Sequence, residues 1–389
     1  METVVNVGDL RRLAKKRLPK LCYDFIEGGT DDELGLITNE QAFRQARIVP
    51  RYLVDVSVRD QSTTLFRRAY SSPIGIAPTG LGDLFRRGAD LMLAEAACQA
   101  NVPFIMSGHS SSLIEDLGRL APNHGWYQIY TAVDPSISED MIKRVRDAGL
   151  KTLVLTVDVP ETSNRERIIR NGWGPSRKLT WSTKLEAMLH PAWMLEWLQH
   201  GTPYFGNWAR YLSEDATPKA VADFVGSQSR APMTWKHVER YRELWKGNFV
   251  LKGIMDPDDA VRAQSLGVDG IIVSNHGGRQ LDNAPSPLEV LPATCRAVGD
   301  TMTVMLDGGI RRGLHALIAI CAGAKFVFQG RPTLYGVTAG GVTGAAKVLE
   351  IFRREIDISM AQIGAANIAD LGPQFLMWSD KANLHPTRR

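Results

Sequence analysis

Cysteine is scarce in this sequence and never occurs in a redox or metal-binding pattern. Only four are present among 389 residues, Cys22, Cys98, Cys295 and Cys321, and no two of them form a CxxC pair. Their number and spacing argue against a disulfide framework and against a zinc site, and they suit a reducing compartment. We therefore expect no structural disulfide and no bound metal.

Long apolar runs are missing as well. No run approaches the roughly 18 residues that a membrane-spanning helix needs. The amino terminus, METVVNVGDLRRLAKKRL, also lacks the apolar core and small-residue cleavage site of a signal peptide. The protein is therefore expected to be cytoplasmic, and any membrane contact is expected to be monotopic.

Neither sign of charge is in large excess. Lys and Arg number 46 and Asp and Glu 42, which gives a formal net charge of +4. So mild a bias is not the footprint of a nucleic-acid-binding protein, although it suits anionic substrates or membranes. A GxGxxG turn between a strand and a helix is also absent, which argues against a Rossmann-type NAD site.

What the sequence does contain is a regular series of short apolar runs from residue 74 onward. Each run ends in polar or Gly residues, and most are followed by a helical pattern such as Ala89 to Ala100 or Gly313 to Cys321. Eight strands alternating with helices predict a (β/α)₈ TIM barrel of the α/β class. The predicted strands are Ile74–Ala77, Phe104–Ser107, Trp126–Tyr130, Leu153–Val157, Phe249–Lys252, Gly270–Ser274, Thr303–Asp307 and Lys325–Gln329.

The rest of the chain divides around this barrel, and we predict a single domain over residues 1–389. Residues 1–69 form an N-terminal helical cap, in which Asp9 is expected to cap a helix over Arg11 to Leu18 and Pro19 to start the next. The barrel halves are 70–172 and 213–345, and a C-terminal helix and tail follow over 346–389. The long spacing between strands four and five indicates an insertion at 173–212.

The insertion is rich in tryptophan. It holds five of the nine Trp residues, mixed with Leu and Met and bordered by the cations Arg177, Lys178, Lys184 and Arg210. Amphipathic Trp with flanking cations suits a membrane interface. The same composition suits a lid or an oligomer contact, and by itself it favours neither. The five are Trp173, Trp181, Trp193, Trp197 and Trp208.

One strand end carries the strongest chemical signal, in the stretch Ser274-Asn-His-Gly-Gly-Arg-Gln-Leu-Asp282. His276 and Arg279 follow a buried strand, and Gly277 and Gly278 permit a tight turn that brings them together. The carboxyl ends of barrel strands are where such folds keep their chemistry. A base and a cation are therefore expected in one site.

SNHGGRQLD resembles the signature of the FMN-dependent 2-hydroxy-acid dehydrogenase and oxidase family, and the similarity runs from Tyr23 to about Gly344. Within that family the chain looks most like the membrane-associated (S)-mandelate and L-lactate dehydrogenases, whose membrane segment resembles the HPAW at His190 to Trp193. The resemblance implies FMN-dependent oxidation of an (S)-2-hydroxy acid, mandelate-like or lactate-like, with electrons passed to a quinone or another acceptor. It also implies a homotetramer, seated peripherally on the inner face of the cell membrane through 173–212.

The cofactor site follows from the barrel and from the family together. In such barrels a phosphate binds after strands seven and eight, where Gly308, Gly309 and Gly330 offer N–H groups and Arg311 and Arg331 supply charge. The resemblance adds Lys252 as the cation beside the flavin ring. It implies that the other ring and loop contacts are Ala77, Pro78, Thr79, Ser107, Gln128, Thr156, Ser274 and Asp307.

The resemblance also assigns the catalytic and substrate-binding roles. His276 is the expected base, Asp158 pairs with it, and Tyr130 binds the substrate hydroxyl. The expected ligands of the substrate carboxylate are Arg279, Arg165 and Tyr23, while Gly80 lies at the substrate as in the membrane dehydrogenases.

The chain departs from the family pattern after strand two, where Gly108 replaces the usual Thr. The following His109 is expected to be an exposed loop residue rather than part of the site. Two alternative functions remain open: an oxidase that uses O₂ and releases H₂O₂, and a non-redox barrel that binds FMN or phosphate.

Overall fold

The computed structural model describes residues 1–172, 180–229, 231 and 233–378, and its centre is a closed barrel of eight parallel strands. The last strand returns to the first, with Val327 opposite Ile74 and Gln329 opposite Ile76. Each of the eight predicted runs overlaps one barrel strand, so the predicted TIM barrel is confirmed. The strands are β4 (Ile74–Ile76), β5 (Phe104–Met106), β6 (Gly125–Ile129), β7 (Thr152–Thr156), β8 (Asn248–Ile254), β9 (Gly270–Val273), β10 (Thr303–Leu306) and β11 (Phe326–Gln329).

The barrel interior is filled by large side chains from alternate positions of the strands. Trp126, Phe326 and Phe328 pack there with Ile105, Val154, Val250, Ile272 and Met305. A hairpin of β2 (Thr63–Leu65) and β3 (Arg68–Tyr70) adds Leu65 and Tyr70 to this cluster. Because side chains alternate along a strand, the next inward positions are Gln128, Thr156, Lys252, Ser274 and Asp307, at the carboxyl ends.

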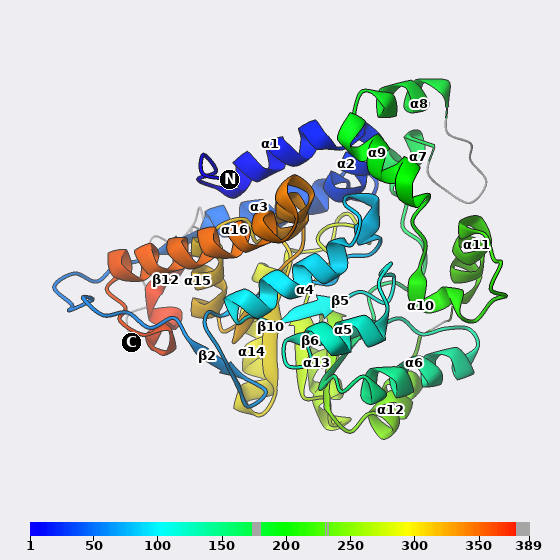
Figure 1. Ribbon diagram of the computed structural model, residues 1–389. Helices are drawn as coiled ribbons and strands as arrows, with labels where there is room; N and C mark the ends of the chain where they lie inside the picture. The colour runs from blue at the N-terminus through cyan, green and yellow to red at the C-terminus, as the bar shows by residue number, and fades with distance from the viewer. Residues whose placement is uncertain (173–179, 230, 232, 379–389) are drawn as a thin grey trace.

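Helices surround the barrel on its outer face (Figure 1). The last of them, α16, is interrupted by non-helical backbone at Gly340 and Gly341 and runs through residue 345, so the barrel and the C-terminal helix share one element. The helices are α4 (Ala89–Ala100), α5 (Ile114–Leu120), α6 (Pro135–Asp147), α12 (Trp235–Leu244), α13 (Pro257–Ser265), α14 (Pro287–Val298), α15 (Gly313–Cys321) and α16 (Arg331–Ile363), with 3₁₀ turns η1 (Gly82–Leu84), η2 (Gly299–Thr301), η3 (Ile368–Asp370) and η4 (Pro373–Phe375).

The N-terminal cap consists of α1 (Val7–Arg17), α2 (Lys20–Glu27) and α3 (Leu34–Gln45). The predicted cap of the first helix is wrong by three residues. Asn6 is the N-cap, and its side chain accepts a hydrogen bond from the backbone N–H of Asp9, whose carboxylate accepts one from the N–H of Asn6. A short strand, β1 (Ala46–Ile48), follows and pairs with β12 (Leu376–Trp378) near the other end of the chain.

The insertion between β7 and α12 contains α7 (Glu166–Arg170), α8 (Trp181–Met188), α9 (Pro191–His200), α10 (Gly206–Ala209) and α11 (Pro218–Gln228). Figure 1 shows α8 and α9 at the outer edge of the molecule, beyond α2. Polar contacts join these two helices to the N-terminal cap. Glu196 of α9 pairs with Arg17 of α1, and Glu186 of α8 accepts a hydrogen bond of 2.9 Å from the N–H of Lys20. Trp173, Arg177 and Lys178 lie outside the described residues.

The tryptophans of the insertion do not share one environment. Trp181 and Trp197 are 79% and 40% exposed, together with neighbouring Leu and Met side chains of α8 and α9. Trp208 is only 1% exposed and donates its Nε1–H to the Gly108 carbonyl at 2.8 Å. An interfacial role for Trp208 is therefore excluded, because its indole is part of the core. Among the described residues, no helix is both long and apolar enough to cross a membrane.

Candidate active site

A cavity of about 640 Å³ opens at the carboxyl end of the barrel. That size is within the range of small-molecule and cofactor sites. The predicted site residues that line it come from the loops after most of the strands. They are Ala77, Pro78, Thr79, Gly80, Ser107, Tyr130, Arg165, Lys252, His276, Arg279, Asp307, Gly308, Gly309, Arg311, Gly330 and Arg331.

His276 and Asp158 form a hydrogen-bonded pair in this cavity. His276 Nδ1 lies 2.9 Å from Asp158 Oδ1, and its backbone N–H donates to Ser274 Oγ at 3.0 Å. Burial lowers the pKa of His276 more than Asp158 raises it, and Lys252 lowers it further. Burial opposes ionisation of Asp158, but His276 and Lys252 outweigh it and hold the pKa of Asp158 below its usual value. His276 is therefore a neutral imidazole oriented by a carboxylate.

Four arginines line the same cavity: Arg165, Arg279, Arg311 and Arg331. Arg311 pairs with Glu40, whereas the other three form no ion pair with a carboxylate within the described part of the chain. Burial and the charges of Arg165 and Arg331 lower the pKa of Arg279 well below its usual value, because the guanidinium is crowded by like charge. These buried positive charges repel one another, and an anionic ligand bound among them would relieve the repulsion.

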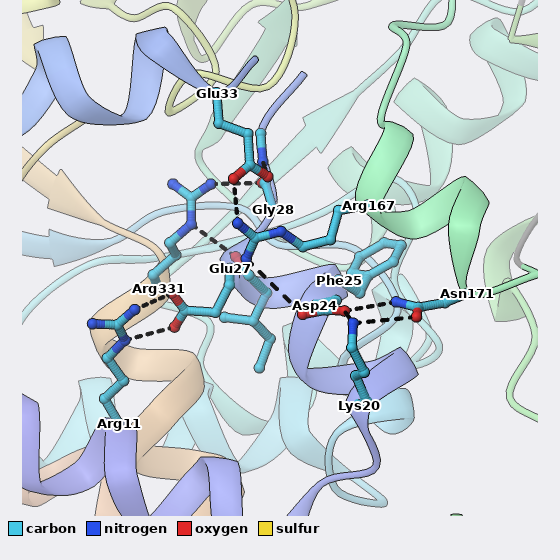
Figure 2. A network of polar contacts seen from close by, with 12 residues as sticks. Arg11, Lys20, Asp24, Phe25, Glu27, Gly28, Glu33, Arg167, Asn171 and Arg331 are labelled. Atoms are coloured by element: carbon cyan, nitrogen blue, oxygen red, sulfur yellow. Dashed lines mark hydrogen bonds and ion pairs between the residues drawn. The ribbon is translucent and has the colours of Figure 1, made fainter. Parts of the chain in front are cut away.

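Backbone carbonyls and an amide hold these guanidinium groups in position. Arg279 Nη1 donates to the carbonyls of Phe25 and Gly28 at 3.0 and 2.7 Å. Arg165 Nη2 donates to Gln280 Oε1 at 2.7 Å. Figure 2 shows the nearby Arg167 turned instead toward Glu33 and Asp24. Arg167 is not among the residues that line the cavity.

Tyr23 is not among the residues that line the cavity, so the prediction that it binds the substrate is wrong in geometry. Its ring faces the side of α2 where Lys15 Nζ lies 5.8 Å from the ring centre. Phe25 lines the cavity instead. Residues that are two apart on a helix do not share a face, so Tyr23 and Phe25 cannot both face the cavity, and the packing of α2 against the barrel decides which of them does. The wall that Phe25 forms offers no hydroxyl.

His109 is also not where it was expected. It lines the cavity, and its ring stacks on Tyr130 with centroids 4.5 Å apart. Burial lowers its pKa to about 4, with a smaller contribution from the charge of Arg165. The expectation of an exposed loop residue is wrong because α10 and the end of α11 cover this loop. Burial raises the pKa of the neighbouring Tyr130 to about 12, so its hydroxyl stays protonated.

Lys252 supplies a fixed cation at the end of β8. Its Nζ lies 3.2 Å from Asp307 Oδ2 and donates to Ser274 Oγ at 3.1 Å. Burial disfavours the charged form, but Asp307 and Asp158 outweigh it and the pKa of Lys252 is raised. Gln128 and Thr156 are both buried at inward positions of β6 and β7, and Thr156 lies opposite Lys252 in the strand pair.

At the end of β10, Gly308 and Gly309 have φ of 93° and 75°, which favour glycine. Arg311 Nε lies 3.0 Å from Glu40 Oε1. Arg331 donates to the carbonyls of Ile26, Gly28 and Gly277 at 2.7 to 3.0 Å. The residues predicted to hold a phosphate therefore lie together, with N–H groups and two cations.

A closed parallel barrel with a His–Asp pair and an arginine cluster at its carboxyl end defines an α/β-barrel enzyme that binds an anionic ligand. The model of the FMN-dependent dehydrogenase family matches residues 14–378, and the chain belongs to this family.

Individual relatives are similar over nearly their full length. An (S)-mandelate dehydrogenase from Pseudomonas putida is 39% identical, covering 99% of this chain and 97% of the relative. An L-lactate dehydrogenase from Xanthobacter autotrophicus is 36% identical, covering 96% of each. The solved structure of a monotopic membrane protein, (S)-mandelate dehydrogenase, matches with a TM-score of 0.93 at 38% identity, covering 97% of this chain and all of that one. The barrel also matches a mandelate oxidase, with a TM-score of 0.82 at 33% identity.

The residues of the cavity fit FMN, the cofactor of this family. Thr79 Oγ1, Gln128 Nε2 and Asp307 Oδ1 are buried polar atoms that have no hydrogen-bond partner among the described residues. Buried polar atoms normally have a hydrogen-bond partner, so these three atoms are suited to hydrogen bonds with the polar ring of a flavin at the strand ends. Arg311 and Arg331 suit a phosphate.

Proposed function

We propose that the protein oxidises an (S)-2-hydroxy acid, mandelate-like or lactate-like, to the 2-oxo acid and passes the electrons to a quinone or another acceptor. The observation that carries this proposal is the neutral His276, paired with Asp158, in the same cavity as the uncompensated Arg165 and Arg279. Oxidation of an alcohol next to a carboxylate needs a base for the hydroxyl or carbon proton and a cation for the carboxylate. The names of the relatives support this substrate class.

Each residue has a role that its geometry permits. Arg165 and Arg279 bind the substrate carboxylate, and Tyr130 donates to or accepts from the substrate hydroxyl. Since Asp158 engages Nδ1 of His276, the proton is taken by Nε2, and Asp158 stabilises the imidazolium that results. FMN, when bound, accepts the two electrons. Lys252 provides positive charge at the strand ends to favour the reduced flavin.

Flavin absorbance under anaerobic conditions tests the proposal directly. The purified holoenzyme should be bleached by (S)-mandelate or (S)-lactate and not by the matching acid that lacks the hydroxyl, phenylacetate or propionate. A flavin that no member of a 2-hydroxy-acid panel reduces would refute the proposed activity. That result would favour a non-redox barrel that binds FMN.

An oxidase that uses O₂ and releases H₂O₂ is the second candidate. The specific observation in its favour is the similarity to a peroxisomal (S)-2-hydroxyacid oxidase from Arabidopsis thaliana, which is 36% identical over 95% of this chain. Peroxide yield per turnover in air separates the two. A dehydrogenase should give little peroxide and reduce a soluble quinone quickly, whereas an oxidase should give one peroxide per product.

We further propose that α8 and α9 seat the enzyme peripherally on the inner face of the cell membrane. Trp181, Leu189 and Leu198 are 79%, 77% and 69% exposed on these helices. Lys184 Nζ lies 4.8 Å from the centre of the Trp181 ring, next to the apolar face. Exposed apolar side chains with a flanking cation suit an interfacial helix pair. Binding of the intact enzyme to anionic vesicles tests this proposal.

The last proposal is a homotetramer, as the resemblance implies. The loop between β1 and β2 supports it, since Tyr52, Leu53 and Val58 are exposed there without a covering element. Multi-angle light scattering of the purified enzyme measures the mass, and a monomer would contradict the proposal.

A further inference from the structure

His109 belongs to the wall of the substrate cavity, although the chain departs from its family's pattern at this loop. Two other parts of the site contact this residue. Its ring stacks on Tyr130, and its Cβ lies close to Gly80, where an added Cβ would come within 3.1 Å of it. Its backbone N–H donates to Ser107 Oγ at 3.1 Å. The loop backbone therefore holds the ring at the wall of the cavity, in contact with Tyr130.

The insertion completes this wall. The Phe205 ring centre lies 5.2 Å from that of His109, and that of Trp208 lies at 6.2 Å. Ser229 Oγ lies 3.4 Å from His109 Nε2. Phe205 and Ser229 also line the cavity. One wall of the site is therefore aromatic and comes from the loop after β5 and from both sides of α11.

The groups on the substrate carbon can be assigned by elimination, on the basis of the proposed function. Its carboxylate is taken by Arg165 and Arg279, and its hydroxyl by Tyr130 and His276. The remaining substituent, the side chain of the hydroxy acid, is left to contact the lining residues next to Tyr130. Those are His109 and, beyond it, Phe205.

We propose that His109 determines substrate specificity, as an uncharged flat wall that favours a 2-hydroxy acid with an aryl side chain over one with a short alkyl side chain. The ring is uncharged at neutral pH because burial lowers its pKa to about 4. A neutral imidazole presents an aromatic face or edge to a second ring, whereas an imidazolium at this position would be repelled by the charge of Arg165. Aromatic rings whose centroids lie about 4.5 to 7 Å apart attract each other by more than the hydrophobic free energy of the area that they bury. This inference rests on the proposed function and narrows it to one substrate class.

Three variants of the holoenzyme test the role of the ring. His109→Ala removes the wall, His109→Leu fills its volume without a flat ring, and His109→Phe keeps the flat ring without nitrogen atoms. The ratio of flavin reduction kcat/KM for (S)-mandelate to that for (S)-lactate should fall about 10-fold in His109→Ala and His109→Leu. In His109→Phe the ratio should stay within about 3-fold of wild type, because the aromatic surface is kept.

Ligand binding gives a readout that needs no turnover. Perturbation of the flavin spectrum yields dissociation constants for phenylacetate and acetate, and their ratio should shift in the same variants by a similar factor. An unchanged ratio in His109→Ala and His109→Leu would overturn the proposal. Equal losses for both substrates would also overturn it, because they would indicate a role through Tyr130 alone. Should no hydroxy acid reduce the wild-type flavin, the proposed function fails, while the binding ratio still decides the role of His109.

Discussion

At the residue scale, the pairing of His276 with Asp158 predicts that removing His276 slows the reaction without affecting the binding of FMN. His276→Ala removes the base but none of the groups that suit the phosphate or the ring. Flavin content should therefore equal that of wild type, while reduction by substrate slows by about 10²-fold or more. Stopped-flow absorbance measures the rate, and reduction near the wild-type rate would exclude His276 as the base.

The charge state of His276 predicts how the reaction depends on pH. Its pKa is lowered below the ordinary 6.5, mainly by burial, so the neutral base is present at and above neutral pH. Protonation removes the base as the pH falls through this lowered pKa. The rate of flavin reduction should therefore be constant between about pH 7 and 9, and should decrease about 10-fold per pH unit only below the pKa of His276. A midpoint above 6.5 would contradict a base with a lowered pKa.

Arg279 and Arg167 offer a matched pair of substitutions, since one faces the cavity and the other pairs with Glu33 outside it. Arg279→Lys keeps a charge but loses the planar fork that its two carbonyl contacts orient. It should raise the dissociation constant of a competitive carboxylate about 10-fold or more. Arg167→Lys should leave that constant unchanged. Equal effects in the two variants would count against a carboxylate site at Arg279.

The residue scale is also where sequence reasoning reached its limit. His276 and Arg279 could be predicted because they follow a strand whose end must lie at one rim of the barrel, whereas the roles of Asp158 and Lys252 were implied by the resemblance to the family. Tyr23 and His109 could not be predicted, since their position depends on which face of a helix or loop another segment covers. For His109 that segment is the far end of a long insertion, which no local pattern connects to the loop after β5.

At the scale of elements, the strands were predictable for a simple physical reason. Each is a short, continuous apolar run buried on both faces, and it ends abruptly at polar or Gly residues, so its limits shift by only one to two residues in the structure. The helix cap at Asn6 was missed because Asp9 is an equally good capping residue by type. The capping box uses both, and only the backbone geometry distinguishes the cap from the third helical residue.

Helix α10 is short, and its stability depends on one side chain. Trp208 is 1% exposed and bonds to the Gly108 carbonyl, next to His109. Trp208→Ala should lower the free energy of unfolding by about 3 to 5 kcal/mol through the cavity that it leaves. Trp208→Phe keeps most of the volume and loses one hydrogen bond, which should cost about 1 kcal/mol. Denaturant unfolding of the two variants measures this difference, and equal losses would show that packing around the indole matters little.

At the scale of the whole molecule, the insertion divides into two parts with different surroundings. Residues 181–200 include α8 and α9, which expose Trp181, Leu185, Leu195 and Trp197, while Phe205 lines the cavity and the buried Trp208 lies near His109. Composition alone favoured neither a membrane segment nor a lid, because the exposed part and the buried part of the insertion both contain Trp and other apolar residues. A replacement of the whole of 173–212 would therefore damage the substrate site as well as the proposed membrane surface.

A narrower change separates these effects. Replacing Trp181, Leu189 and Leu198 with Ser removes apolar area from α8 and α9, and should release the enzyme from anionic vesicles because each buried side chain contributes about 1.5 to 3 kcal/mol. The matched control replaces with Ser the residues Val133, Val261 and Ile358, which are also exposed but lie outside α8 and α9, and should leave vesicle binding intact. Flavin content and anaerobic reduction by substrate should be unchanged in the α8–α9 variant, since none of its three positions lines the cavity. Vesicle flotation measures binding, and equal release by the two triple variants would leave α8 and α9 without a special role at the membrane.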